Sequence, residues 1–249
     1  MIRIQSLYKS FKGQKVFSDL NLDIPEGGIT VIIGPSGTGK SVLMKHILGL
    51  IRPDSGSILI NGRDVTVLKE VDLKDVRKEF GVCFQDAALF DSMTVGENVA
   101  FPYTIHTRLS KEEITREVAR LLRDVGLSGI EGKMPSQLSG GMKKRVGLAR
   151  ALALDPRFIF FDEPTSGLDP VISRAINMLI CEVQRKTGGT FLVISHDIQG
   201  ALEMADYMAM LYQGGVAFEG VPEKFRTTSD PLITQYIHGD VEGPISPID

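Results

Sequence analysis

The sequence predicts an α/β fold in which a mixed sheet is flanked by helices, with an antiparallel β portion at the N-terminus and an inserted helical subdomain. Two runs, 158–161 and 191–194, are apolar at every position, as is typical of parallel strands that helices cover on both faces. A helical pattern over about 170–186 separates them. A third short strand, 29–33, is rich in β-branched residues and leads into a glycine-rich loop.

The antiparallel portion is predicted from short strands that are separated by turn residues. Residues 2–4 and 17–24 have strand character, and 25–28 reads Pro-Glu-Gly-Gly, which is typical of a turn. A further strand at 57–60 ends at an Asn-Gly pair, which is a strong hairpin signal.

The pattern becomes helical from about 86 to 154. Ser110 and Glu113 form a capping box at the start of one helix, and Gly126 ends that helix. The apolar residues on its predicted buried face are Ile114, Val118, Leu121, Leu122 and Val125. The helix after the LSGGM segment runs toward Leu154.

These patterns predict three parts of the chain. Residues 1–85 and 155–229 form the α/β core, 86–154 form the helical subdomain, and 230–249 form a C-terminal tail. We find no internal repeat and no low-complexity tract.

Residues 34–41, GPSGTGKS, match the phosphate-loop pattern G-x-x-x-x-G-K-[ST] between a strand and a helix. The glycines allow the backbone N–H groups to point at phosphate oxygens, Lys40 supplies a charge for the β- and γ-phosphates, and the Ser41 hydroxyl suits Mg²⁺. A chance match is the alternative, and the strand–loop–helix context argues against it. The predicted phosphate-binding residues are Gly34, Pro35, Ser36, Gly37, Thr38, Gly39, Lys40 and Ser41.

Two acids end the apolar strand that begins at Phe158. Asp162 and Glu163 would therefore lie at the carboxyl edge of the sheet, where α/β proteins bind ligands. Asp162 is predicted to hold Mg²⁺ and Glu163 to deprotonate the attacking water. An acidic pair at a strand end can also be merely solvated, and the phosphate loop in the same chain favours the functional interpretation.

Two further polar residues also follow predicted strands. Gln85 comes after 80–84, where its amide could contact both the metal and the attacking water. His196 closes the strand 191–195 and is predicted to contact the γ-phosphate. Taken alone, each would be an ordinary surface or structural residue.

The segment LSGGM at 138–142 offers a second set of phosphate-binding groups. Ser139, Gly140 and Gly141 begin a helix, so a hydroxyl, open backbone N–H groups and the positive end of a helix dipole coincide. Since the chain already has a phosphate loop, we predict that this segment covers the γ-phosphate bound by a second copy. A glycine N-cap without any ligand is the alternative.

With these motifs in place, the chain resembles the ATPase subunit of an ABC transporter over nearly its whole length. The resemblance rests on six motifs in the family's order: 34–41, Gln85, 138–142, the strand to Glu163, the loop 166–169 and His196. It implies a P-loop NTPase core, a homodimer that encloses two Mg-ATP, and Ser41, Gln85 and Asp162 as metal ligands. It also implies that Phe11 stacks on adenine, with core packing as the alternative.

Softer similarities point to the Mla-type phospholipid transport ATPases. Met142 replaces the usual glutamine of the signature, and 84–102 and 238–245 resemble that subfamily. The implied partners are an integral-membrane permease and a lipid-binding protein with an MCE domain. Two alternatives remain: an amino-acid importer ATPase and, more distantly, a soluble regulatory ATPase.

We expect the permease to dock near 87–93, because four apolar residues crowd beside Gln85 there. For each of these residues, the alternative is packing in a small core beneath the insert. The four residues are Phe84, Leu89, Phe90 and Met93.

Three other classes of ATP-binding protein do not fit this sequence. The interval from Gln85 to the signature is too short for the long coiled coil of a DNA-repair ATPase, and the chain has one ATPase half where a translation factor has two. A small-molecule kinase would lack LSGGM.

Composition sets the remaining expectations. A net charge of −3 gives no support for nucleic-acid binding. No apolar stretch approaches a membrane span, and the N-terminus is too polar for a signal peptide, so we expect the protein to remain in the cytosol. The resemblance to ABC transporter ATPases further implies a peripheral position on the cytoplasmic face of the inner (plasma) membrane. Cys83 and Cys181 lack metal-ligand spacing, and we expect buried, reduced thiols.

The tail from 230 onward combines glycines and prolines with apolar residues. Gly239, Gly243, Pro244 and Pro247 argue against a regular helix or a central strand there. Its apolar residues instead predict an extended arm that packs on a neighbouring ATPase chain, with a disordered terminus as the alternative. They are Tyr236, Ile237, Val241, Ile245 and Ile248.

Overall fold

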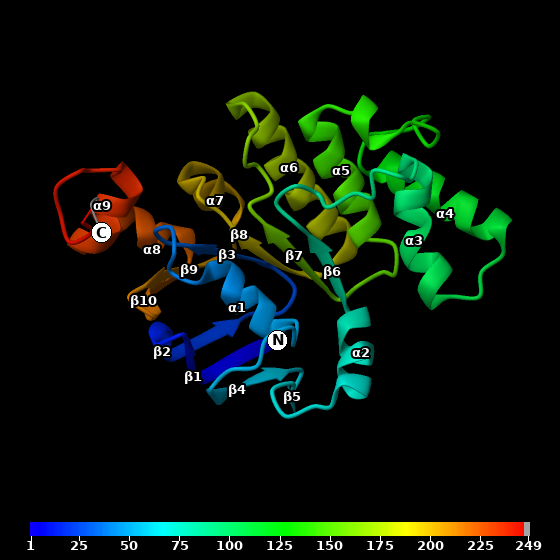
Figure 1. Cartoon of the computed structure of the whole chain (residues 1–249). Helices are drawn as coiled ribbons and strands as arrows, with labels where there is room; N and C mark the ends of the chain where they lie inside the picture. The colour runs from blue at the N-terminus through cyan, green and yellow to red at the C-terminus, as the bar shows by residue number, and fades with distance from the viewer. Residues whose placement is uncertain (247–249) are drawn as a thin grey trace. The chain divides into compact units, whose positions relative to one another are not determined.

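The computed structural model describes residues 1–246 (Figure 1). The chain separates into two compact units. The first contains Met1–Val67 and the chain from Ile194 onward, and the second contains Leu68–Val193. The predicted helical subdomain, 86–154, lies within the second unit, and its separation from an α/β core remains a prediction.

The first unit holds an antiparallel sheet with the strand order β2-β1-β4-β5. Its turn at Asn61 and Gly62 has positive φ at both residues, 50° and 82°, as a tight two-residue hairpin requires. The predicted strands and hairpin are confirmed, and the first two strands are longer than the patterns indicated. The strands are β1 (Ile2–Phe11), β2 (Gln14–Ile24), β4 (Ser55–Ile60) and β5 (Arg63–Asp64).

The same unit contains a second group of strands, in which β3 pairs parallel to β9 and β9 pairs antiparallel to β10. All five residues of β3 are buried, as expected of a strand covered on both faces. The strands are β3 (Ile29–Ile33), β9 (Tyr207–Tyr212) and β10 (Gly215–Gly220), and the helices of this unit are α1 (Lys40–Ile47), α7 (Ile198–Met204), α8 (Pro222–Thr227) and α9 (Pro231–His238).

Helix α9 contradicts the prediction that the tail contains no regular helix. Asp230 caps its N-terminus, Pro231 occupies the first turn, where a missing N–H costs nothing, and Gly239 (φ 74°) ends it. The first of the glycines therefore terminates the helix and does not interrupt it.

The chain after α9 folds back on the first unit, which also differs from the predicted extended arm. The buried side chain of Gln235 donates to the Ile245 carbonyl at 2.9 Å and accepts from the Ile245 N–H at 2.7 Å, and the Tyr212 hydroxyl donates to the Pro244 carbonyl at 3.1 Å. The predicted contributions of Pro247 and Ile248 fall outside the described residues.

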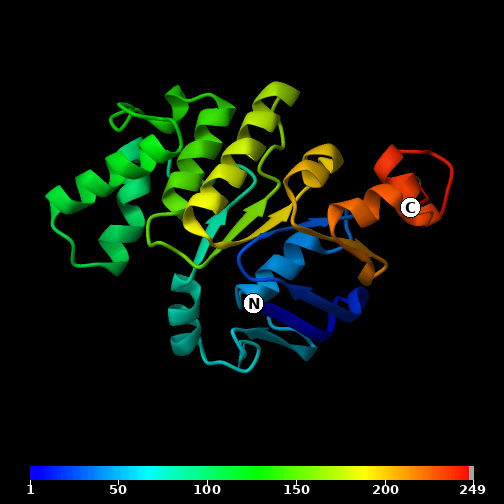
Figure 2. The ribbon, with the colours of Figure 1, turned by 180° about the vertical axis from the view of Figure 1, so that it is seen from behind.

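The second unit contains parallel strands covered by helices. β6 pairs parallel to β7, and β8 follows β7 in the strand order. Figures 1 and 2 show α5 and α6 side by side. The strands are β6 (Phe80–Cys83), β7 (Phe158–Asp162) and β8 (Thr190–Ile194), and the last residue of β8 is counted with the first unit. The helices are α2 (Glu70–Lys78), α3 (Val95–His106), α4 (Lys111–Asp124), a 3₁₀ turn (Pro135–Gln137), α5 (Gly140–Ala151) and α6 (Pro170–Thr187).

Three helices of this unit, α4, α5 and α6, begin where the sequence predicts. Ser110 and Glu113 form the expected capping box of α4, and a second capping box joins Thr94 and Glu97 at α3. Helix α2 was not predicted, because its mostly charged segment shows only two buried residues, Leu73 and Val76.

Both cysteines are free thiols, as predicted. Cys83 is buried, and its burial raises the pKa of the thiol to about 12, which makes it unreactive. Cys181 is half-buried instead of buried. Within residues 1–246, no helix is both long and apolar enough to cross a membrane.

Candidate functional site

The phosphate loop, residues 34–39, connects β3 to α1 in the first unit. Gly34, Gly37 and Gly39 all have positive φ, at 142°, 80° and 92°. A Cβ on Gly34 would lie 2.3 Å from the Leu211 carbonyl oxygen, and one on Gly39 would lie 2.7 Å from Val16. The loop conformation therefore needs glycine at these two positions both for its backbone angles and for its close packing.

Short-range hydrogen bonds hold this loop in its curled form. The buried ammonium of Lys40 donates to the carbonyls of Gly34 and Pro35, each at 2.8 Å, and the Thr38 hydroxyl donates to the Pro35 carbonyl at 2.9 Å. Ser36 and Gly37 form the exposed tip. The loop leads directly into the N-terminus of α1, so its backbone N–H groups and the helix dipole suit phosphate oxygens.

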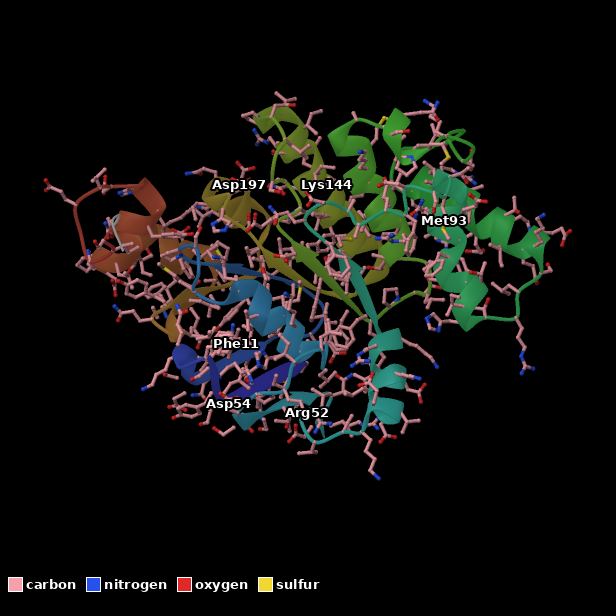
Figure 3. All side chains as sticks on the ribbon, viewed as in Figure 1. Phe11, Arg52, Asp54, Met93, Lys144 and Asp197 are labelled. Atoms are coloured by element: carbon pink, nitrogen blue, oxygen red, sulfur yellow. The ribbon has the colours of Figure 1, made fainter. Side chains whose placement is uncertain are left out.

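His196 and Phe11 also belong to the first unit. The N–H of Ser195 donates to the Ile32 carbonyl at 3.2 Å, which places the exposed His196 in the segment beside the end of β3. Phe11 is 41% exposed at the end of β1 (Figure 3), with the Lys9 ammonium 5.1 Å from its ring centroid. Phe11 is therefore not a core residue, and its ring is available for stacking.

In the second unit, Asp162 is the last residue of β7 and Glu163 begins the following loop. Both are partly exposed, as predicted for side chains at the carboxyl edge of the sheet. Glu163 has φ +50°, a conformation that non-glycine residues rarely adopt. Its carbonyl accepts hydrogen bonds from the Ser166 N–H and the Lys144 ammonium, each at 3.2 Å.

Gln85 is exposed and follows β6. The Lys144 ammonium also donates to its main-chain carbonyl. The structure thus brings Gln85 and Glu163 together through one lysine of α5.

Ser139, Gly140 and Gly141 lie at the N-terminus of α5, with Ser139 and Gly140 exposed. The Ser139 hydroxyl caps the helix by accepting from the Met142 N–H at 3.4 Å. A Cβ on Gly141 would lie 2.8 Å from Ile172 of α6, so close helix packing by itself accounts for that glycine. The glycines alone therefore do not distinguish a ligand-binding segment from a structural N-cap.

These residues fit a nucleotide with a divalent cation. The glycine cradle around Lys40 has no room for a Cβ at its base, as a loop that wraps phosphates requires. Ser41, Gln85 and Asp162 carry hydroxyl, amide and carboxylate oxygens, which are the hard ligands that Mg²⁺ prefers.

A sequence model of the family described as ABC transporter matches residues 17–166, more than half of the chain. The chain belongs to the ABC transporter family. It is the ATPase component, or cassette, and the expected ATPase activity and α/β fold are confirmed by the matches that follow.

Similar proteins match nearly the whole cassette. It is 44% identical over 244 residues to the "Probable ribonucleotide transport ATP-binding protein mkl" of Mycobacterium leprae, covering 98% of this chain and 70% of that protein. It is 40% identical over 245 residues to the "Intermembrane phospholipid transport system ATP-binding protein MlaF" of Haemophilus influenzae, covering 98% and 93% of the two chains.

Solved cassette structures share the fold. CbiO1 from Clostridium perfringens, part of the ABC transporter complex cbiONQ, has a TM-score of 0.84 at 28% identity, covering 96% of this chain and 95% of the other. The ATP-binding cassette MJ0796, solved as a dimer in a post-hydrolysis state bound to ADP and Pi, has a TM-score of 0.81 at 32% identity, covering 89% and 99%.

Three contact residues of the cassette were not predicted. The Tyr236 hydroxyl of α9 accepts from the Gly34 N–H at 3.2 Å, and Lys144 and Arg150 of α5 hold main-chain carbonyls of other segments. Tyr236 lies 202 residues from Gly34. Such long-range contacts leave no local spacing pattern in the sequence.

Two of the four apolar residues near Gln85 border a cleft of about 590 Å³ in the second unit. Phe84 and Phe90 are 44% and 41% exposed, and both line this cleft together with Phe101. Leu89 and Met93 are half-buried. Phe84 and Phe90 are thus surface residues, whereas Leu89 and Met93 are partly covered.

Proposed function

We propose that this cassette is the ATP-hydrolysing motor of a transporter that moves phospholipids between membranes. The observation that carries the proposal is the 40% identity to MlaF, which spans 98% of this chain and 93% of that protein. The proposed partners are an integral-membrane permease and a lipid-binding protein with an MCE domain, and the proposed location is the cytoplasmic face of the inner membrane.

The proposed nucleotide contacts follow the chemistry of the described residues. The loop N–H groups and Lys40 bind the phosphates, and Phe11 stacks on the adenine ring. Ser41, Gln85 and Asp162 would hold Mg²⁺. When bound, that ion neutralises charge on the β- and γ-phosphates.

Hydrolysis is assigned to Glu163, Gln85 and His196. The Glu163 carboxylate accepts a proton from the attacking water, and the Gln85 amide orients that water. His196 donates a hydrogen bond to the γ-phosphate.

We further propose that two cassettes form a head-to-tail homodimer. In it, Ser139, Gly140 and Gly141 of one chain cover the γ-phosphate that the other chain binds. The dimeric structure of MJ0796 supports this assembly. Its clearest support from the chain itself is that Ser139 and Gly140 are exposed at a helix N-terminus.

The permease is proposed to dock on the cleft beside Gln85. The cleft is largely apolar and exposes the rings of Phe84 and Phe90, and Arg150 lies 5.9 Å from the Phe90 centroid. Apolar surface with a polar rim is typical of a protein-binding site. Phe90→Asp should weaken co-purification with the permease without changing ATP affinity.

The similarity to mkl, whose name assigns it to ribonucleotide transport, favours a second substrate class at 44% identity. Purification of the intact membrane complex, followed by mass spectrometry of bound small molecules, distinguishes the two. We expect phospholipids to be enriched in the wild-type complex, and ATP-dependent transfer of these lipids between vesicles to stop in Glu163→Gln. Enrichment of ribonucleotides without lipid transfer would contradict the proposal.

A further inference from the structure

One face of α5 holds the loop that follows β6. Lys144, Gly147 and Arg150 are spaced by three residues and so share a helix face. The Arg150 guanidinium donates to the carbonyls of Ala87 and Ala88, each at 2.7 Å. A Cβ on Gly147 would lie 3.2 Å from the Ala87 Cβ, so glycine at this position allows the loop to approach closely.

The loop is held in a conformation that its residues disfavour. Ala87 and Ala88 have φ of +59° and +45°, and an L-residue with a Cβ rarely occupies this left-handed region. Strained backbone of this kind persists only where the surroundings fix it. Here the surroundings are the two cations of α5, which bind the carbonyls of three loop residues.

Lys144 extends this arrangement to Glu163. Lys144 is labelled in Figure 3. Its ammonium donates to the Gln85 carbonyl and, at 3.2 Å, to the Glu163 carbonyl. Glu163 is itself in the left-handed region, with φ +50°. One charged group therefore holds two strained segments from distant parts of the sequence, and hydrogen bonds from a charged donor are roughly twice as strong as neutral ones.

We propose that Lys144 is a positioning residue that couples the loop after β6 to Glu163. Displacement of the loop moves the Gln85 carbonyl, shifts the shared ammonium, and thereby changes how the Glu163 main chain presents its carboxylate. This inference rests on the proposed function, in which Glu163 is the base and the loop borders the docking surface. The coupling through Lys144 connects the docking surface to the residue that activates the attacking water.

Lys144→Met tests the coupling, with Lys144→Arg as the conservative variant and Lys143→Met as the matched control on the same helix. We expect Lys144→Met to lower the kcat of ATP hydrolysis by about 2- to 30-fold while KM stays unchanged. Lys144→Arg should keep most of the wild-type kcat, and Lys143→Met should have the same kcat as the wild type. An unchanged kcat, or a parallel loss of ATP affinity, would overturn the proposal.

A double-mutant cycle with Arg150→Met tests whether the loop after β6 acts on Glu163 through Lys144. Arg150 reaches Glu163 only through the loop and Lys144 in this account, so Arg150→Met should lower kcat in the wild type and have little further effect in Lys144→Met. Additive losses would show that the two cations act independently and would contradict the route.

Hydrogen exchange gives a readout that does not depend on activity. In Lys144→Met, amides of both segments, 84–90 and 163–168, should exchange faster, while Lys143→Met changes neither. Faster exchange in one segment alone would contradict the coupling. If Glu163→Gln retained normal ATPase activity, the proposed catalytic role would fail, whereas the exchange result would still decide whether Lys144 joins the two segments.

Discussion

The phosphate loop of the first unit and the loop after β6 of the second are both irregular segments with positive φ, but they are stabilised in different ways. In the phosphate loop, glycines adopt these angles, and Lys40 and Thr38 hold carbonyls no more than six residues away. In the loop after β6, two alanines adopt positive φ, and cations of α5 donate hydrogen bonds to loop carbonyls that are 59 to 63 residues away in the sequence. A loop built from glycine and local contacts is visible in a sequence, whereas a loop held by distant cations is not.

The largest expected effect concerns Glu163 of the second unit, whose carbonyl accepts from the same Lys144 that binds the loop after β6. Glu163→Gln should lower ATP turnover by about 10²- to 10⁴-fold, because the attacking water loses its base while the phosphate cradle stays intact. ATP affinity, measured by calorimetry, should remain near the wild-type value. ATPase activity within about threefold of wild type would remove Glu163 from the catalytic role.

A pair of glycine substitutions compares local packing within the phosphate loop. Gly39→Ala should destabilise the fold by about 2–5 kcal/mol, since its Cβ adds a clash with Val16 and Phe17 to the cost of a positive φ. Gly37→Ala has the same kind of φ but open space around its Cβ, so about 1–2 kcal/mol is expected. Urea unfolding of the two variants measures the difference, and equal losses would show that packing does not constrain the loop.

Tyr236 makes a long-range hydrogen bond to the phosphate loop, so its removal tests whether local contacts alone position that loop. Tyr236→Phe removes the hydroxyl that accepts from the Gly34 N–H at 3.2 Å and keeps the half-buried ring. We expect ATP affinity to fall by about 2- to 10-fold, as the loss of one neutral hydrogen bond implies. Tyr212→Phe, which removes the hydrogen bond to the Pro244 carbonyl, is the control and should leave affinity unchanged. Equal affinities of wild type and Tyr236→Phe would show that local contacts alone position the loop.

The smallest expected effect is a pH dependence of stability in the helix that follows the phosphate loop. Burial is the main cause that lowers the pKa of His46 below its usual 6.5, and Lys9 lowers it further, while the Val42 carbonyl and Asp54 oppose the shift. The folded protein therefore protonates this histidine less readily than the unfolded chain, which binds a proton below about pH 6.5.

Stability contributed by His46 should thus be complete above pH 6.5 and decline as the pH falls, by up to about 1.4 kcal/mol per pH unit. Thermal unfolding between pH 7.5 and 5.5 should show a smaller pH dependence in His46→Gln than in wild type. The exposed His106→Gln is the control. An identical slope in His46→Gln would assign the acid sensitivity to other groups.

The sequence predicted the elements that depend on local chemistry. The strands, the hairpin at Asn61, the capping box at Ser110 and the phosphate loop each follow from residues that are close in the chain. The helix α9 was missed because Gly239 was counted against a helix that it in fact ends. The contacts of Lys144, Arg150 and Tyr236 depend on which segments the fold brings together, and no spacing in the sequence encodes that.

The most direct test of the account is whether two chains share each ATP site. Ser139→Arg and Lys40→Ala should each abolish ATPase activity alone, the first by filling the space for the neighbour's γ-phosphate and the second by removing a phosphate contact. In a mixed dimer both lesions fall at one site and leave the other intact. Mixing equal amounts should therefore restore up to about a quarter of wild-type activity, because half of randomly assembled dimers are mixed. Activity that stays at the level of the separate variants would contradict the shared site.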